Sequence, residues 1–136
     1  MIGLRRGDVR LFEHNKEWKI EGERTVNELR EILGSDAVDI QHVGSTSIKS
    51  IKAKPIIDIA VGTDDFNRIL SHEAELLKAG YHYRPNQDMG GAQLLFACGS
   101  YYEGGDMQTH FIHVVKYNSM EWRNYINIRD YLNTYP

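Results

Sequence analysis

A short polar run in the first half of the chain has the composition of an anion-binding turn. It follows an alternating apolar and polar segment and consists of Gly44, Ser45, Thr46 and Ser47. Glycine lets a ligand approach the backbone, and the hydroxyl groups can donate hydrogen bonds. Backbone amides in such a turn, just before a helical piece, are suited to phosphate oxygens. The same residues also suit an ordinary turn with a helix cap, which is the structural alternative.

The second candidate is Asp58, an acidic residue inside the apolar run from Pro55 to Val61. A carboxylate left unpaired in such a strand costs roughly several kcal/mol, so Asp58 needs a metal ion, a cation or the sheet edge. Ionisable groups of this kind cluster at functional sites, which favours a metal or substrate role. The alternative is a structural ion pair with Lys54, four residues earlier.

The elements that position these residues follow from hydrophobic periodicity. Spacing predicts an amphipathic helix over 17–33 that ends at Gly34, and strands over 38–43 and 55–61. The second strand is apolar at nearly every position, as expected of a strand covered on both faces, with Pro55 at its first position. We expect a short helical piece around 48–51.

The second half of the chain continues in the same manner. An apolar stripe predicts a helix from Asp64–Asp65 to Gly80, and two strands follow over 93–98 and 108–115, joined across a glycine-rich turn at 99–105. A last helix is expected over 119–132, with Ser119 near its cap. These elements predict one α/β (α+β) domain over residues 1–136, built in layers.

The residues of the turn and the strand also carry a family resemblance. Gly44-Ser45, twelve intervening residues and Asp58 on an apolar strand resemble the minimal signature of the nucleotidyltransferase superfamily. The whole run from His42 to Ile59 is more narrowly similar to the GrpB family. Further matches extend over nearly the whole chain: Val9-x-Leu11 with Lys16-Glu17-Trp18, which resemble the family's first strand and helix start, then Gly80-Tyr81-x-Tyr83, Thr109-His110, His113-Val114-Val115, Glu121-Trp122 and Arg129-Asp130-Tyr131-Leu132.

The resemblance implies a nucleotidyltransferase-like mixed sheet flanked by helices. It also implies that the native chain continues past Pro136, because family members commonly extend beyond the closing helix. Proven members of the superfamily hold two Mg²⁺ ions with Asp-x-Asp or Asp-x-Glu and a third carboxylate on a later strand. Here Ala60 stands where the second acid is expected, on the same strand face as Asp58.

Histidines occupy the strand where the resemblance places the third carboxylate. His110 and His113 point to opposite faces of a regular strand, and His113 is the one that could approach Asp58. We expect Asp58 and His113 to be catalytic residues and, with His110, metal ligands, with His42 in a supporting position. Such a set favours a transition metal over a plain pair of Mg²⁺ ions. The expected cofactor is a divalent ion, with Mg²⁺, Mn²⁺ and Zn²⁺ as the candidates. The alternative for each histidine is a structural core or surface group.

Positive charge for a phosphate would come from Lys49, Lys52 and Lys54, which flank the Gly-Ser turn, and we expect Lys54 to bind the phosphate. Arg84 and Arg129 could converge on the site from elsewhere, with Arg129 in a supporting position on the last helix. The alternatives are a solvated lysine face and an Arg129–Asp130 ion pair. Tyr101 and Tyr102 could stack on a base, although a surface loop also explains them.

Composition limits the partners and the compartment. The formal net charge of −3 provides no general field for a polyanion, which argues against a nucleic-acid partner and favours a small-molecule or nucleotide ligand. Cys98 is the single cysteine, so a reducing compartment is expected. The first residues lack a signal-peptide pattern, and the longest apolar run is too short to span a membrane. We therefore expect a cytoplasmic protein without membrane attachment; the sequence does not indicate an oligomeric state.

Three hypotheses for function follow from these residues. The first is a metal-dependent transferase that moves a nucleotidyl or phosphoryl group onto a small molecule. The second is a non-catalytic nucleotide or phosphometabolite binder on a degenerate transferase scaffold. The third is an interaction module in which Asp58 and the histidines are structural.

Overall fold

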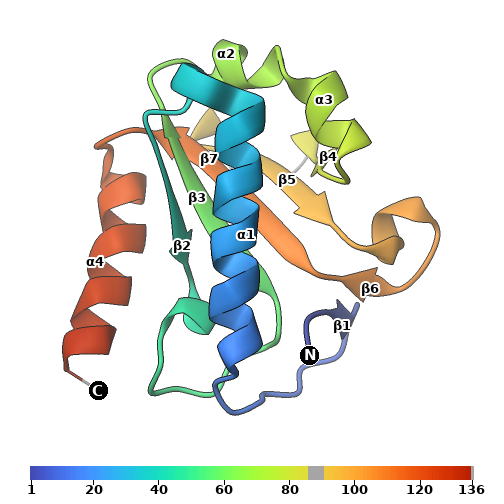
Figure 1. Cartoon of the computed structure of the whole chain (residues 1–136), viewed down its shortest axis with the longest axis vertical. Coiled ribbons are helices and arrows are strands. Elements are labelled where there is room, and N and C mark those ends of the chain that lie inside the picture. Colours follow the sequence, from blue (N-terminus) through green and yellow to red (C-terminus); the bar gives the residue numbers. More distant parts are fainter. Residues whose placement is uncertain (86–90, 136) are drawn as a thin grey trace.

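A five-stranded mixed sheet forms the centre of the molecule in the computed structural model, which describes residues 1–85 and 91–135. Its order is β2-β3-β7-β5-β4, in which only β3 and β7 are parallel neighbours. The strands are β2 (Asp39–Val43), β3 (Ile57–Thr63), β7 (His110–Lys116), β5 (Leu94–Cys98) and β4 (His82–Tyr83). Figure 1 shows β3 in the middle, with β2 and β7 on its two sides.

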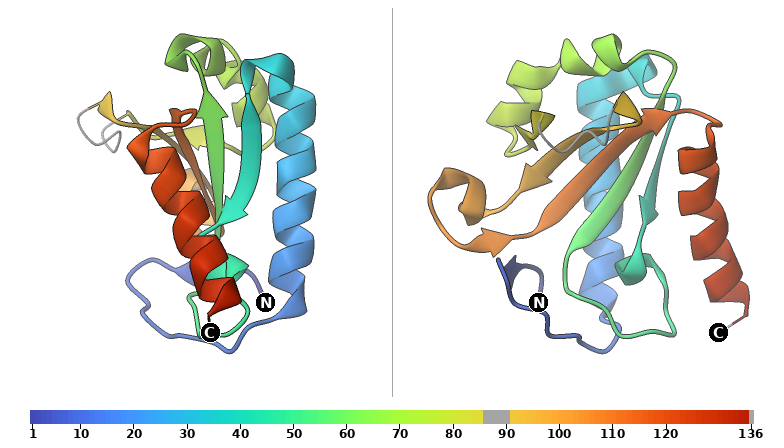
Figure 2. Two further views of the ribbon diagram at one scale, coloured as in Figure 1. Left: turned by 90° about the vertical axis from the view of Figure 1, so that its left-hand side faces the viewer. Right: turned by 180° about the vertical axis from the view of Figure 1, so that it is seen from behind.

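Helices cover both faces of this sheet (Figure 2). One face carries α1 (Lys16–Leu33), α2 (Phe66–Leu70) and α3 (Glu73–Lys78), and the other carries α4 (Met120–Thr134). The larger core lies on the α1 side and includes Trp18, Leu29 and Ile59. A smaller cluster on the α4 side joins Ala60 to Trp122. Because β3 contributes to both clusters, it is buried on both faces, as its apolar sequence predicts.

The two long helices lie where the hydrophobic spacing predicts them. The Asn15 side chain caps α1 by accepting a hydrogen bond from the Glu17 amide, and Ser119 caps α4 in the same way. Together with the mixed sheet, these helices confirm the predicted α/β fold class.

Several predicted bounds were wrong for identifiable reasons. The expected helix over 64–80 is divided into α2 and α3 at His72, whose ring is held by Asp36 at 2.8 Å and by Glu75 at 3.1 Å. Residues 48–51 are not helical. The helical piece expected there lies earlier, as the 3₁₀ turn η2 (Ser45–Ser47) directly after Gly44. Strand β3 begins at Ile57 and not at Pro55, because the Pro55 carbonyl accepts a hydrogen bond from the Gly3 amide, which lies outside the sheet.

The first residues of the chain return to the edge of this fold. Strand β1 (Leu4–Arg5) pairs with β6 (Met107–Gln108), just before β7, and Phe12 forms a bridge with Ala53. Periodicity gave no indication of either pairing or of the two-residue strand β4. Within residues 1–85 and 91–135, none of the helices has the length and apolar content needed to cross a membrane.

Candidate functional site

Asp58 lies in an open cleft at the start of β3, which we call the Asp58 cleft. The cleft has a volume of about 540 Å³, and the turn η2, the segment 52–56 and the N-terminal residues form its walls. Its lining includes Arg5, Asp8, Val9, Leu11, Ser45, Lys52, Lys54, Asp58 and Phe111. Asp58 forms no ion pair with Lys54 among the described residues, so the alternative of a structural pair between these two residues is wrong.

The partner of Asp58 is His113. Nε2 of His113 lies 2.9 Å from Oδ1 of Asp58, which confirms that this histidine approaches the carboxylate from the neighbouring strand. The register explains the contact, since Asp58 pairs with Phe111 and Ala60 pairs with His113 on the parallel strand. As the carboxylate accepts, Nε2 carries the proton. The His113 ring packs on Tyr125 of α4, with the ring centres 5.2 Å apart, and its Nδ1 is buried without a hydrogen-bond partner in the described structure.

Gly44 allows the turn to approach the same carboxylate. Its φ of 72° is unfavourable for other residues, and a Cβ placed on it would lie 2.6 Å from Oδ2 of Asp58. Gly44 therefore brings the backbone of the predicted anion-binding turn next to the predicted metal-binding acid. The two motifs found in the sequence form one site.

The four residues of the turn have different roles. Ser45 is exposed and lines the Asp58 cleft. Thr46 is buried and its hydroxyl lies 2.9 Å from Nε2 of His42, while the Ser47 hydroxyl donates to the Gly44 carbonyl at 2.5 Å. The hydroxyl groups of Thr46 and Ser47 are thus used within the turn, which leaves Ser45 as the hydroxyl that faces the cleft.

His42 lies on the other face of the sheet from Asp58. It pairs with Ile59 in the register of β2 and β3, and its ring lies over Gly22 of α1, where a Cβ would be 2.4 Å from Nδ1. Burial lowers the pKa of His42 to about 4, although the nearby Asp58 charge opposes the shift. His42 is therefore neutral at pH 7 and supports the turn through Thr46, without touching Asp58.

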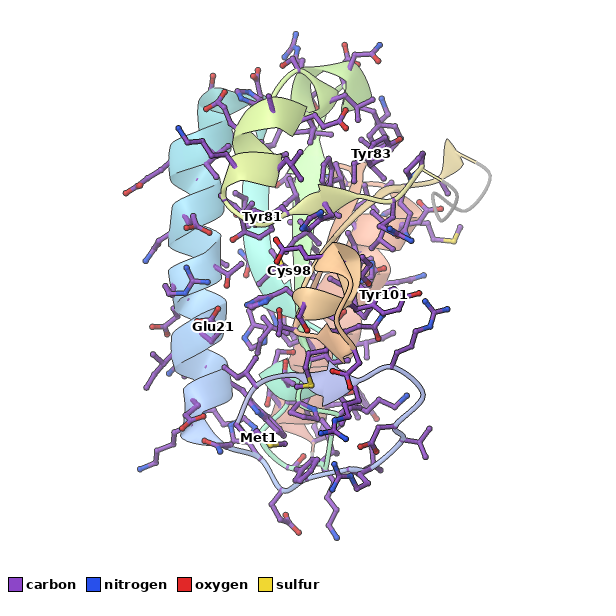
Figure 3. All side chains as sticks on the ribbon, turned by 90° about the vertical axis from the view of Figure 1, so that its right-hand side faces the viewer. Met1, Glu21, Tyr81, Tyr83, Cys98 and Tyr101 are labelled. Atoms are coloured by element: carbon purple, nitrogen blue, oxygen red, sulfur yellow. The ribbon has the colours of Figure 1, made fainter. Side chains whose placement is uncertain are left out.

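His110 also lies on the α1 side, so His110 and Asp58 cannot share one metal ion in this structure. Its Nε2 lies 2.6 Å from Oε2 of Glu21, and its Nδ1 lies 2.7 Å from the Thr109 hydroxyl. Glu21 also accepts a hydrogen bond from Arg24. The hydrogen bond from Arg24 is the largest cause that lowers the pKa of Glu21, the contact with His110 adds to it, and the pKa falls to about 2. Figure 3 shows Glu21 on α1 and Cys98 at the end of β5 on this side of the molecule. No signal in the sequence pointed to this network.

Other residues considered from the sequence have structural partners outside the Asp58 cleft. Arg129 donates to the Gln41 side chain and the His42 carbonyl, at 2.9 and 3.1 Å, and so fastens α4 to β2. It is also paired with Asp130 at 2.9 Å. Tyr101 contacts Arg6, and Tyr102 stacks with His82 and Arg84. None of these side chains lines the Asp58 cleft.

The N-terminal segment is the part of the site that sequence reasoning missed. Arg5, Val9 and Leu11 line the cleft because the β1–β6 pairing and the Phe12–Ala53 bridge hold this segment beside the site. Val9 and Leu11 are large apolar residues that are 73% and 57% exposed there. The pairing joins residues far apart in the chain, so no local pattern could reveal it.

The donor atoms do not fit the two-ion arrangement implied by the superfamily resemblance. Asp58 is the only acid of β3, and the positions beside it on the same face are Ala60 and, across the strand pair, Phe111. Among residues 1–85 and 91–135, no group of three or more His, Cys, Asp or Glu side chains is placed to hold a metal ion. A single cation held by Asp58 together with the phosphates of a ligand is compatible with these residues, because Mg²⁺ often uses one carboxylate in this way.

Known proteins share this architecture. The chain is 39% identical, over its full length and 78% of the relative's length, to the "Glutamate-rich protein GrpB" of Alkalihalophilus pseudofirmus. The crystal structure of the conserved protein GrpB from Enterococcus faecalis matches with a TM-score of 0.83 at 25% identity, covering 93% of this chain and 74% of that one.

A more distant likeness concerns the fold alone. The Cid1 poly(U) polymerase, solved with MgGTP bound, matches with a TM-score of 0.57 at 16% identity, over 89% of this chain and 38% of that one. The chain therefore has a nucleotidyltransferase-like fold. The family model described as "GrpB protein" matches residues 8–136. This chain belongs to the GrpB family.

Proposed function

We propose that this chain binds a phosphate-bearing small molecule, either a nucleotide or another phosphorylated metabolite, in the Asp58 cleft. The observation that supports the proposal is the junction of Gly44, Ser45 and Asp58 at the wall of a cleft that Arg5, Lys52 and Lys54 also line. Lys54 is exposed and has no ion pair among the described residues. It is therefore available to an anion.

The backbone of the turn adds donors to this positive side chain. Hydrogen bonds within η2 come from the amides of Ser47 and Ile48, so the turn itself does not use the amides of Ser45 and Thr46. Asp58 would hold a divalent cation that enters with the phosphates, with Mg²⁺, Mn²⁺ and Zn²⁺ as the ions to compare. The ligand of the Cid1 polymerase, MgGTP, combines the same two components.

Thermal unfolding in the presence of ligands tests this proposal. Nucleotides and sugar phosphates, each with and without the divalent ions, should raise the melting temperature of the native chain, because a ligand at about 100 times its Kd stabilises by about 2.7 kcal/mol. Lys54→Ala should reduce the shift. The matched control is Lys78→Ala, since Lys78 is an exposed lysine in the last turn of α3 and lies outside the Asp58 cleft.

Asp58→Asn separates the hypotheses. If the proposal is correct, this variant folds and loses the part of the shift that depends on the metal ion. If Asp58→Asn unfolds and no phosphorylated compound shifts the native chain, Asp58 is structural and the domain acts as an interaction module.

Nucleotidyl or phosphoryl transfer to a small molecule is the second candidate. The observation that favours it is the Asp58–His113 contact at the wall of the cleft. Release of pyrophosphate or of a nucleoside diphosphate, measured with the ligand that binds, would support transfer. Binding without turnover selects the non-catalytic binder.

A further inference from the structure

A second cleft lies on the other side of the η2 turn, and we call it the basic cleft. It is lined by His14, Lys16, Lys19, Ile20, Glu23 and Lys49 and has a volume of about 560 Å³, similar to that of the Asp58 cleft. Its walls come from the first turns of α1 and from the loop that follows η2. The segment 45–54 thus contributes to both clefts, through Lys49 on one side and Ser45, Lys52 and Lys54 on the other.

The charges of the basic cleft are not balanced. Three lysines face one glutamate, Glu23, and within the described structure Lys16, Lys19 and Lys49 have no ion pair. Lys16 and Lys19 stand in the first turn or so of α1, near the end at which the helix dipole is itself positive. Helix stability favours acidic residues at this position. The lysines therefore add to the positive potential of the cleft, at a position where they gain nothing from the helix dipole.

Two further groups in the cleft lack partners. Nδ1 of His14 is buried and has no hydrogen-bond partner among the described residues, although the ring is held edge-on to Trp18 with the ring centres 5.6 Å apart. Ile20 is 67% exposed and lines the same cleft as the lysines, so the cleft also has an apolar surface. An anion with an organic part would complement both the charges and this apolar surface.

We propose that the basic cleft binds the phosphate group of a second ligand, independently of the Asp58 cleft. Lys16, Lys19 and Lys49 would contact the phosphate oxygens, and Ile20 would contact the organic part of the same ligand. The phosphate can belong to a small molecule or to a nucleic-acid strand. The chemistry of recognition is the same in both cases, and the experiment distinguishes the two sources.

Equilibrium titration of the native chain tests the proposal, with inorganic triphosphate, a nucleoside triphosphate and a short single-stranded RNA as probes. Lys19→Ala and Lys49→Ala should each weaken binding at the basic cleft by about three- to five-fold, the range expected for partly exposed charge pairs. Lys19→Glu should weaken it further. The controls are Lys78→Ala, away from both clefts, and Lys54→Ala, which changes only the Asp58 cleft.

The outcomes separate this proposal from the proposed function. A binding event that is lost in Lys19→Glu and retained in Lys54→Ala establishes the basic cleft. If the Asp58 cleft binds the same probe, its own binding event shows the opposite pattern, retained in Lys19→Glu and weakened in Lys54→Ala. Tighter binding of the nucleoside triphosphate than of triphosphate assigns a small molecule, and binding of RNA alone assigns a nucleic-acid strand. Circular dichroism first establishes that the Lys19→Glu variant is folded. The proposal is overturned if the substitutions at Lys19 and Lys49 then leave the affinity for every probe unchanged, or if no probe binds the native chain.

Discussion

The Cα of Gly44 lies so close to the carboxylate of Asp58 that a β-carbon at residue 44 would stand 2.6 Å from Oδ2 and 2.9 Å from the Asp58 Cβ. Both atoms belong to a residue of β3, an interior strand that is held on each side by a neighbouring strand. Strand β3 cannot move away to make room. The approach of the turn to the acid thus requires a glycine.

Gly44→Ala should therefore destabilise the protein by about 2–4 kcal/mol. About 1–2 kcal/mol comes from the positive φ of 72°, and the rest from displacing the turn or Asp58. Urea unfolding measures the loss. Gly104→Ala is the comparison for a positive φ without a contact, because Gly104 has a φ of 95° and a Cβ there meets nothing within 4 Å; its ψ is 1°, compared with −175° at Gly44. Equal losses in the two variants would show that the contact with Asp58 contributes nothing.

The Asp58–His113 contact should appear as a coupling energy. His113→Phe keeps an aromatic ring against Tyr125 and removes the hydrogen bond to the carboxylate, and Asp58→Ala removes the acceptor. Hydrogen bonds to charged groups contribute about 1.5–3 kcal/mol when buried, and partial exposure of this pair reduces the expected coupling to about 1–2 kcal/mol. A double-mutant cycle on the free energy of unfolding measures this coupling. Additive losses, within about 0.5 kcal/mol, would contradict the contact.

The network on the α1 side should produce an acid-sensitive contribution to stability. The pKa of Glu21 is lowered from 4.5 to about 2 in the folded protein, so its stabilisation is present above pH 4.5 and is lost as the pH falls toward 2. Because Glu21 is partly exposed, we expect about 2 kcal/mol at pH 7. Urea unfolding of Glu21→Gln should differ from the native chain by this amount at neutral pH and converge with it near pH 2.

Glu31→Gln provides the comparison for that series, since Glu31 is an exposed residue of the same helix. The free energy of unfolding of Glu31→Gln should stay close to that of the native chain from pH 7 down to pH 2. A difference for Glu21→Gln that persists unchanged down to pH 2 would show that the network stabilises through packing and not through charge.

Protonation of His42 should lower the stability of the folded protein in a higher pH range than protonation of Glu21. The pKa of His42 is lowered to about 4 by burial against α1, whereas the unfolded chain titrates near 6.5. Protons then bind preferentially to the unfolded state, so stability is full above pH 6.5 and falls by about 3 kcal/mol as the pH decreases to 4. NMR titration of the His42 ring gives the pKa directly. A titration midpoint near 6.5 would contradict the buried position over Gly22.

The sequence alone predicted Gly44, Ser45, Asp58 and His113 as candidate site residues, and it predicted the main elements. Apolar spacing predicts α1 and α4 to within a residue or two at each end, since one face of each helix must be buried. The apolar run around Asp58 predicts a strand covered on both faces, and alternation predicts that His110 and His113 point in opposite directions. These are local properties, because each depends on residues that are close in the chain.

Only the tertiary structure decided which of those residues meet. The parallel register of β3 and β7 brings His113 to Asp58 and sends His110 to Glu21, and the return of the N-terminal segment places Arg5 and Leu11 beside the turn. The tertiary structure also brings Lys16 and Lys19 of α1 to the same cleft as Lys49. Register and chain return depend on pairings between distant segments, whose free energy comes from burying both partners together, so neither segment carries the information by itself.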